Sequence, residues 1–234
     1  MTKPPLSVEE LPPDARGALD AIVKAVASDP RAPSSVRNPE DAWRVHIADS
    51  LAGLEFADLL AASAIADLGA GAGFPGLPLA VMLRDARVDL IEASSRKCEF
   101  MRRTIGTAGI NRARVICKRS EEWAGLAPPG GGREAYGAVV ARAVGRLATL
   151  AELASPLLRD GGVLVAWKGR RDPDEESELE RASERLAMQP EEVRWVGPYA
   201  GSRNRHLHLM RKRGSTPGGL PRRPGMAKKR PFGS

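Results

Sequence analysis

The chain lacks the features that mark exported, disulfide-bonded or membrane-spanning proteins. Its 234 residues include only two cysteines, Cys98 and Cys117, which are too few for a disulfide framework or a four-cysteine zinc site. No apolar run approaches the roughly 20 residues that cross a bilayer, and residues 1–11 have no apolar signal core. We therefore expect a cytoplasmic, monomeric protein with no membrane association and no bound metal.

Acidic residues are absent from the end of the chain. Eight of its 36 Lys and Arg residues lie in residues 211–234, and residues 1–210 then hold 28 basic against 29 acidic residues. Because this last segment is also rich in glycine and proline, we expect a disordered tail that contacts a polyanion, nucleic acid foremost. The alternative is a tail that only increases solubility.

Aromatic residues make up only 4% of the chain, yet 42% of its residues are hydrophobic, enough for a sizeable core. From residue 63 onward, short apolar runs alternate with helical patterns. This alternation is typical of an α/β fold with a parallel sheet covered on both faces. The predicted strands are residues 64–68, 88–92, 114–117, 138–141 and 163–167, followed by a closing pair at 193–196 and 206–210.

The first part of the chain shows helical patterns without predicted strands. Asn38 is expected to cap a helix that begins at Pro39, since asparagine accepts from the free amides of a helix start and proline suits the first turn. We therefore divide the chain into a helical N-terminal extension (1–62), an α/β domain (63–210) and the basic tail (211–234).

The most informative motif follows the first predicted strand. Asp67 ends the strand, Gly69, Gly71 and Gly73 follow at alternate positions, and a helix-forming run begins near Pro75. Glycine is required where the backbone turns with positive φ or presses against a ligand. A strand, a glycine turn and a helix start together build a nucleotide cradle, so the sequence predicts a cofactor site here.

The spacing of these glycines narrows the choice of cofactor. A nicotinamide-binding loop prefers G-x-G-x-x-G, and a phosphate-binding P-loop needs G-K-[ST]; neither is present. The carboxylate of Asp67 would repel a pyrophosphate, but it suits the sulfonium and ammonium groups of S-adenosylmethionine (SAM). A glycine turn with no ligand is the alternative.

Three further acidic or polar residues follow the next two strands. Glu92 ends the second strand, where an α/β nucleotide site places the acid that accepts from both ribose hydroxyls. Ser120 and Glu121 follow the third strand and are expected near the adenine edge, whereas Trp123 is expected in the core. An ordinary carboxylate at a strand end is the alternative for Glu92.

Two cations follow the fourth and fifth strands. Arg142 and Lys168 each come directly after a buried run, at the carboxyl edge where such folds bind ligands. Both fit a substrate that carries phosphate. The alternative for each is a structural ion pair.

Several short segments occur in an order known from one enzyme family. They read D-L-G-A-G-A-G-F-P-G-L-P-L-A-V, L-I-E-A-S-S-R-K, R-S-E-E-W, A-R-A-V and W-K-G, with S-S-V-R-N-P-E-D and H-I-A-D-S-L upstream and R-N-R-H-L and P-R-R-P-G-M-A-K-K-R-P downstream. Over roughly residues 34–231 the chain resembles the RsmG (GidB) family, which methylates guanine N7 in bacterial small-subunit ribosomal RNA.

The resemblance implies a fold, a cofactor and a partner. The fold is that of class I SAM-dependent methyltransferases, Rossmann-like, with a mostly parallel seven-stranded sheet and a helical N-terminal piece. The partner is small-subunit rRNA or the assembled 30S particle. The implied SAM contacts are Gly69, Phe74, Ser120, Glu121 and Arg142, with Glu92 at the ribose.

The chain departs from the family pattern near its N-terminus. Val45 stands where the family usually has an arginine before the histidine of its helix motif, and Arg44 lies one position earlier. The W-N pair and the N-L-T segment common in the family are also missing. These departures concern the docking of RNA rather than the cofactor site.

Other chemistries lack their motifs. No [DN]-P-P-[FYW] follows the fourth strand, as an amino-methylating enzyme would need, and no Pro-Cys pair offers a nucleophile for pyrimidine C5. Guanine N7 is a lone-pair nucleophile that needs no base, so we expect Arg142 and Lys168 to hold a phosphate or the guanine O6 edge. Three alternatives stay open: a methyltransferase for a small molecule or another RNA, an RNA-binding module with a vestigial SAM pocket, and, last, a nicotinamide oxidoreductase.

Overall fold

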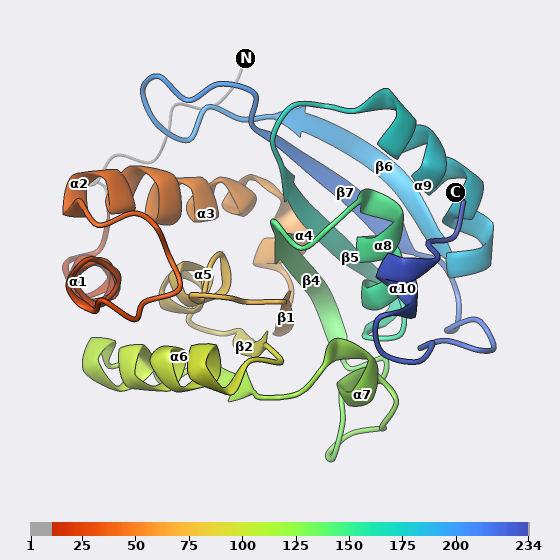
Figure 1. Cartoon of the computed structure of the whole chain (residues 1–234), viewed down its shortest axis with the longest axis horizontal. Coiled ribbons are helices and arrows are strands. Elements are labelled where there is room, and N and C mark those ends of the chain that lie inside the picture. Colours follow the sequence, from red (N-terminus) through yellow and green to blue (C-terminus); the bar gives the residue numbers. More distant parts are fainter. Residues whose placement is uncertain (1–10, 234) are drawn as a thin grey trace.

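The structure, a computed structural model, describes residues 11–233 and contains one seven-stranded sheet (Figure 1). Its strands are β1 (Ala64–Leu68), β2 (Arg87–Ile91), β3 (Ala113–Ile116), β4 (Tyr136–Arg142), β5 (Leu158–Lys168), β6 (Met188–Trp195) and β7 (His206–Lys212). Their order is β3-β2-β1-β4-β5-β7-β6. The first five strands are parallel, and β7 runs antiparallel to β5 and β6. The mostly parallel α/β sheet is confirmed.

Helices flank this sheet and fill the N-terminal part of the described chain. The N-terminal helical elements are α1 (Pro13–Ser28), α2 (Pro39–Ala42), a π-helical turn η2 (Trp43–Ala48), α3 (Asp49–Leu51), a 3₁₀ turn η3 (Ala52–Glu55) and α4 (Ala57–Leu60). The later helices are α5 (Gly76–Met82), α6 (Ser95–Ala108), α7 (Ser120–Ala124), α8 (Leu147–Ala154), α9 (Pro173–Leu186) and α10 (Met226–Lys229). The predicted cap is confirmed, since the Asn38 side chain accepts from the amide of Asp41 at 3.0 Å.

Two hydrophobic clusters cover the two faces of the sheet, because neighbouring residues on each strand point in opposite directions. Val140 of β4 packs with the N-terminal helices, α5 and α6, whereas Val139 packs with α7, α8 and α9. Figure 1 shows α1, α5 and α6 grouped apart from α8 and α9. Among the described residues, no helix is long and apolar enough to span a bilayer.

The N-terminal helices dock on the sheet through Trp167 at the end of β5. The indole Nε1 donates to the carbonyl of Asp49 at 2.7 Å. A Cβ atom on Gly53 would lie only 2.5 Å from the same ring, so the contact requires glycine at this position. The N-terminal helices and one face of the sheet therefore belong to the same hydrophobic cluster.

The C-terminal segment differs from the disordered tail expected for residues 211–234. Arg211 and Lys212 belong to β7, and Lys212 is fully buried with its Nζ donating to the carbonyls of Ser155 at 2.8 Å and Leu158 at 3.2 Å. Leu220 and Ala227 are also buried. The expectation of disorder for this segment was wrong.

The physical reason lies in where the partners of its cations are. Arg222 pairs with Glu152 of α8 and stacks on Phe232, and Arg211 pairs with Asp58 and Glu191. These acids lie far away in the sequence, so a count of local charge does not show them. The glycines of the segment serve turns, since Gly214, Gly219 and Gly225 have φ of 79°, 82° and 83°.

Candidate cofactor site

The glycine corner lies where the chain leaves β1 for α5. Strands β1 and β4 are neighbours here, and their connections lead to opposite faces of the sheet, the switch point at which such folds bind ligands. Gly69, Gly71 and Gly73 have φ of 69°, 61° and 95°, which side chains rarely adopt. A Cβ on Gly69 would also lie 2.9 Å from Val144 Cγ2. The corner therefore requires glycine for its backbone shape.

Asp67 lies beneath this corner and is fully buried. Its Oδ2 accepts the amide hydrogen of Gly76 at 2.8 Å, which ties the strand end to the start of α5. Its Oδ1 is buried and has no hydrogen-bond partner among the described residues. Burial raises the pKa of Asp67 to about 7. The carboxylate therefore has an unused acceptor, and the charge of Arg142 offsets only part of the cost of burying it.

Glu92, at the end of β2, connects the corner to the next loop. Its Oε2 accepts from the amide of Gly71 at 3.1 Å, and its Oε1 accepts from the amide of Ser94 at 2.9 Å. The Nζ of Lys97 lies 3.7 Å from Oε2. Each carboxylate oxygen can accept a second hydrogen bond, so Glu92 can still accept from two hydroxyl groups.

A cavity of about 220 Å³ opens above these strand ends. Four predicted cofactor residues line it: Gly69, Glu92, Ser120 and Glu121. Its remaining wall is formed by Leu68, Ile91, Ala93, Lys118, Arg119, Val144, Thr149, Leu153, Gly225, Ala227 and Lys228. The structure thus brings the ends of the first three strands together around one space, as expected for a nucleotide site.

Five other predicted residues do not line this cavity: Asp67, Gly71, Gly73, Phe74 and Arg142. Phe74 is buried and stacks on His46, with ring centroids 4.4 Å apart and planes at 10°. The Arg142 guanidinium carbon lies 5.3 Å from the centroid of the same ring. Phe74 therefore joins the glycine corner to the N-terminal helices.

Arg142 is already engaged with the N-terminal helices. Its Nη1 donates to Asp49 Oδ2 at 2.9 Å and to the Val45 carbonyl at 3.1 Å. Its Nη2 lies 3.2 Å from His46 Nδ1. With Asp49 buried and the Arg142 side chain only 17% exposed, this contact is an ion pair largely removed from water.

His46 and Asp49 are functional candidates that the sequence reasoning did not select. Burial, and then the charge of Arg142, lower the pKa of His46 to about 4, so the ring is neutral near pH 7. The other ring nitrogen, Nε2, hydrogen-bonds with Ser34 Oγ at 2.9 Å. The signal was the H-I-A-D-S-L segment, which carries both residues on one helical stretch.

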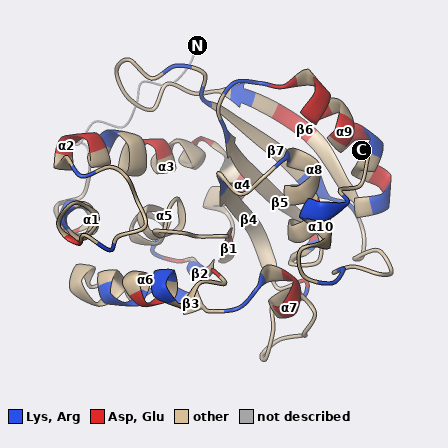
Figure 2. Ribbon diagram, in the orientation of Figure 1, with Lys and Arg blue, Asp and Glu red and all other residues tan. Residues whose placement is uncertain are grey.

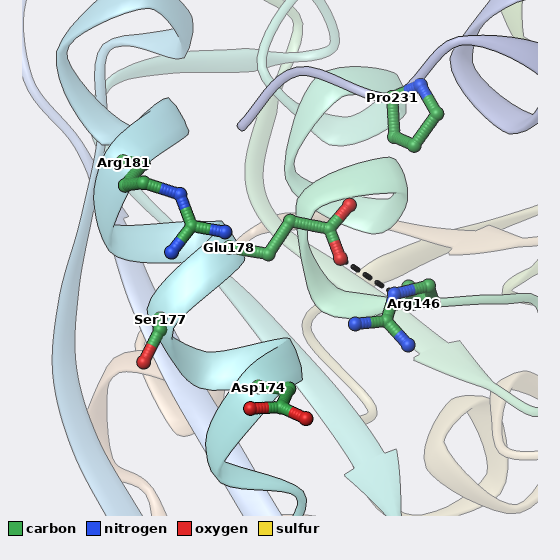
Figure 3. A pocket seen from close by; sticks show the side chains of 6 residues that line it. All are labelled: Arg146, Asp174, Ser177, Glu178, Arg181 and Pro231. Carbon is green, nitrogen blue, oxygen red and sulfur yellow. Dashed lines mark hydrogen bonds and ion pairs between the residues drawn. The ribbon is translucent and has the colours of Figure 1, made fainter. Parts of the chain in front are cut away.

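Lys168 contacts the loop after β4 and the first turns of α9. Its Nζ donates to Glu175 Oε1 at 2.6 Å and to the Gly145 carbonyl at 3.0 Å. Glu175 also accepts the Leu147 amide at 2.6 Å. Arg146 in the same loop pairs with Glu178 at 2.5 Å (Figure 3). Helix α9 thereby fixes residues 143–147 next to the corner.

The pocket in Figure 3 lies on the outer side of this loop. It is lined by Arg146, Asp174, Ser177, Glu178, Arg181 and Pro231 and measures about 450 Å³. Its charges balance, with two arginines against two carboxylates. It shares no lining residue with the cavity above the strand ends.

Ser120 and Glu121 begin α7, and Glu121 is bound by its neighbours. Ser120 Oγ donates to Glu121 Oε2 at 3.0 Å, and the Gly225 amide donates to Glu121 Oε1 at 2.7 Å. Trp123 lies in the core, as predicted, and its Nε1 donates to Tyr136 Oη at 2.8 Å.

The remaining titratable candidates are Cys98, His206 and His208, of which Cys98 and His208 are buried. Cys98 donates to the Glu92 carbonyl at 3.2 Å, and burial raises the pKa of its thiol to about 12. Burial lowers the pKa of His208 to about 4. His206 Nδ1 lies 2.8 Å from the Gly169 carbonyl. Among the described residues, His, Cys, Asp and Glu form no group of three that could hold a metal ion.

Comparison with known proteins adds family information to this geometry. A family model described as rRNA small subunit methyltransferase G (GidB) matches residues 31–207. The curated ribosomal RNA small subunit methyltransferase G of Pelotomaculum thermopropionicum is 41% identical over 188 residues, which cover 80% of this chain and 77% of that protein. The protein of the same name from Rubrobacter xylanophilus is 40% identical and covers 84% and 75% respectively.

Solved structures resemble the chain in fold. A SAM-dependent methyltransferase from Aquifex aeolicus is 16% identical, with a TM-score of 0.51 over 82% of this chain and 98% of that chain. A protein of Agrobacterium tumefaciens described as a predicted O-methyltransferase is 23% identical, with a TM-score of 0.50 over 82% and 80%. At these identities the likeness shows the class I methyltransferase fold alone.

Proposed function

Since the chain belongs to the rRNA small subunit methyltransferase G family, we propose that it methylates N7 of a guanine in bacterial small-subunit (16S) rRNA. It is an rRNA methyltransferase, and its methyl donor is S-adenosylmethionine. The substrate is the rRNA itself or the assembled 30S particle. The observation that supports this function best is the glycine corner between two carboxylates, beside a cavity at the switch point of the sheet.

The residues of the corner fit the donor in charge and in hydrogen bonding. The unpaired Oδ1 of Asp67 suits the cationic end of SAM, and a cation there would offset the burial that raises the pKa of this carboxyl to about 7. Glu92, Gly69 and Ser120 line the cavity. The remaining lone pairs of Glu92 would accept from the ribose hydroxyls. Gly69 would let the ligand approach the backbone closely, and Ser120 would border the adenine.

The bound donor supplies an electrophilic methyl group, which the lone pair of guanine N7 attacks without prior loss of a proton. The protein therefore needs to position the guanine in line and to manage the charge that moves onto the purine. With a pKa of about 4, the buried His46 is a weak base, which is consistent with a reaction that removes no proton before the attack.

Arg142 and Lys168 border the substrate side at the ends of β4 and β5. Arg142 uses three of its five N–H groups in the contacts described, and Lys168 uses two of three. The remaining N–H groups can hold a phosphate or guanine O6. In this role, their carboxylate partners keep both side chains in place while the RNA binds.

The decisive test is methyl transfer to rRNA from a strain that lacks this modification. We expect SAM-dependent incorporation into one guanine, mapped as N7-methylguanine by mass spectrometry, with fully modified rRNA as the matched control that accepts none. Incorporation into an RNA-free extract but not into rRNA would indicate a small-molecule substrate. Binding of RNA without any binding of SAM would indicate a vestigial pocket.

A further inference from the structure

We infer that the C-terminal strap, residues 217–230, is one wall of the cofactor cavity and that its release controls SAM affinity. This inference rests on the proposed function, because it concerns the same cavity. Gly225, Ala227 and Lys228 of the strap line the cavity together with Glu92 and Ser120. Helix α10 lies against α8 (Figure 1).

Polar contacts at four places hold the strap here, and the first is the hydrogen bond that Arg133 Nη1 donates to the Leu220 carbonyl at 3.0 Å. The Gly225 amide donates to Glu121 Oε1 at 2.7 Å, and Thr149 Oγ1 donates to the Ala227 carbonyl at 3.3 Å. Arg222 donates through Nε to Glu152 Oε1 at 2.6 Å and forms a second bond to the same carboxylate. Such a bidentate pair is among the stronger ion-pair geometries.

The strap has little apolar burial of its own. Leu220 and Ala227 are its buried hydrophobic residues, and α10 is a single turn. Segments held by few apolar contacts open at lower free energy than a core helix. The strap can therefore leave the cavity while the sheet stays folded, with the loss of Leu220 alone from the second hydrophobic cluster.

In this arrangement Glu121 holds the strap in place instead of contacting the adenine directly. Its two carboxylate oxygens accept from Ser120 Oγ and from the Gly225 amide, so it fastens the strap to α7. Glu121 thus shapes the adenine end of the cavity by holding its cover. It is a positioning residue in this inference.

The outer surface of the strap carries cations that do not serve the cavity wall. Arg223, Lys229 and Arg230 are exposed, and Figure 2 shows basic residues on α10. Arg223 and Arg222 are neighbours of equal charge, yet only Arg222 has a buried carboxylate partner. This pair of residues separates the effect of the wall from the effect of charge.

The test compares full-length Arg222→Glu with its matched control, Arg223→Glu, by calorimetric titration with S-adenosylhomocysteine. R222E places a carboxylate against Glu152, which is 2% exposed, so we expect the strap to detach and the affinity to fall at least tenfold. R223E makes the same change in net charge and should retain wild-type affinity. Equal affinities for the wild type and R222E, with the strap detached as judged by proteolysis, would overturn the inference.

A second measurement uses only the wild-type chain, in case R222E fails to fold. Trypsin cleavage after Arg222, Lys228 and Lys229 should slow at least fivefold when S-adenosylhomocysteine is saturating, while cleavage after the exposed Arg170 stays unchanged. Equal protection at both places, or none in the strap, would refute the strap as a wall of the cavity. If no form of the chain binds the ligand, the proposed function fails instead.

Discussion

The carboxyl edge of the sheet has two differently built halves. Where β1 and β2 end, Asp67 and Glu92 hold backbone amides and still have acceptor positions to offer. Where β4 and β5 end, Arg142 and Lys168 are already paired with the carboxylates of Asp49 and Glu175. The first half is prepared for a ligand. The second half is a frame that distant helices hold in place.

The largest expected effect concerns the half of the edge where β4 and β5 end. Arg142→Met should lower the free energy of unfolding by about 3 kcal/mol, because it leaves the buried Asp49 with only Arg205, 3.7 Å away. Urea denaturation monitored by circular dichroism measures this loss. Adding Asp49→Asn to the same chain should restore more than half of it. A fully stable R142M variant would contradict the frame and favour a free, substrate-facing arginine.

The second effect concerns the half prepared for a ligand. Asp67→Asn keeps an oxygen for the Gly76 amide but removes the charge that suits SAM, so SAM affinity should fall about tenfold or more, as expected for a charge-assisted hydrogen bond. Titration calorimetry at pH 7 measures this change. Unchanged SAM affinity would place the cationic end of the cofactor elsewhere.

The same variant should show the opposite effect on the stability of the ligand-free chain. The pKa of Asp67 is raised to about 7 in the fold, so the folded state keeps a proton that the unfolded state loses above about pH 4. The wild type therefore loses stability relative to D67N as pH rises from about 4 to 7. Melting curves at pH 5 and pH 8 test this: the stability advantage of D67N over the wild type should be larger at pH 8 than at pH 5, and an equal advantage at both would contradict it.

Lys168→Met should have a smaller effect on the frame. Glu175 keeps the Leu147 amide as a donor but loses its cation, and we expect a loss of about 1–2 kcal/mol in unfolding free energy. The rate of methyl transfer should fall, while the affinity for S-adenosylhomocysteine stays within about twofold, because Lys168 does not line the cavity. Glu176→Gln on the same helix, where the carboxylate pairs with the exposed Arg171, serves as the control. An unchanged rate in K168M would refute a substrate role for this lysine.

The smallest predicted effect is that the imidazole resonances of His46 do not change with pH. His46 packs within the frame with its pKa lowered to about 4, so its imidazole resonances should not shift between pH 8 and pH 5.5. Heteronuclear NMR of histidine-labelled protein tests this, with the free amino acid as the reference. A titration midpoint near 6 would mean that water reaches the contact between His46 and Arg142.

The same contrast explains what the sequence could and could not predict. The parallel sheet and the glycine corner follow from local patterns, since strand, turn and helix start are adjacent in the chain. Glu92 lines the cavity because parallel strands end at one edge of the sheet, and its contact with the ribose stays a prediction. These features depend on short sequence separations or on a general property of the fold.

The partners of the cations depend on long separations, which spacing does not encode. Asp49 lies 93 residues before Arg142, and Glu152 lies 70 residues before Arg222. A lone basic residue after a strand therefore looked available for substrate, and a basic, glycine-rich end looked disordered. In both cases the three-dimensional fold supplied the carboxylate that local composition did not show.

The contact of Gly53 with the Trp167 ring has a consequence for how this chain can be cut or recombined. The helices before residue 63 cover a face of the sheet and reach it at a distance that only a residue without a side chain permits. A fragment that begins at β1 would leave the hydrophobic side chains on one face of the sheet exposed to water. The helices before residue 63 and the sheet therefore have to stay in one chain when the protein is truncated or recombined.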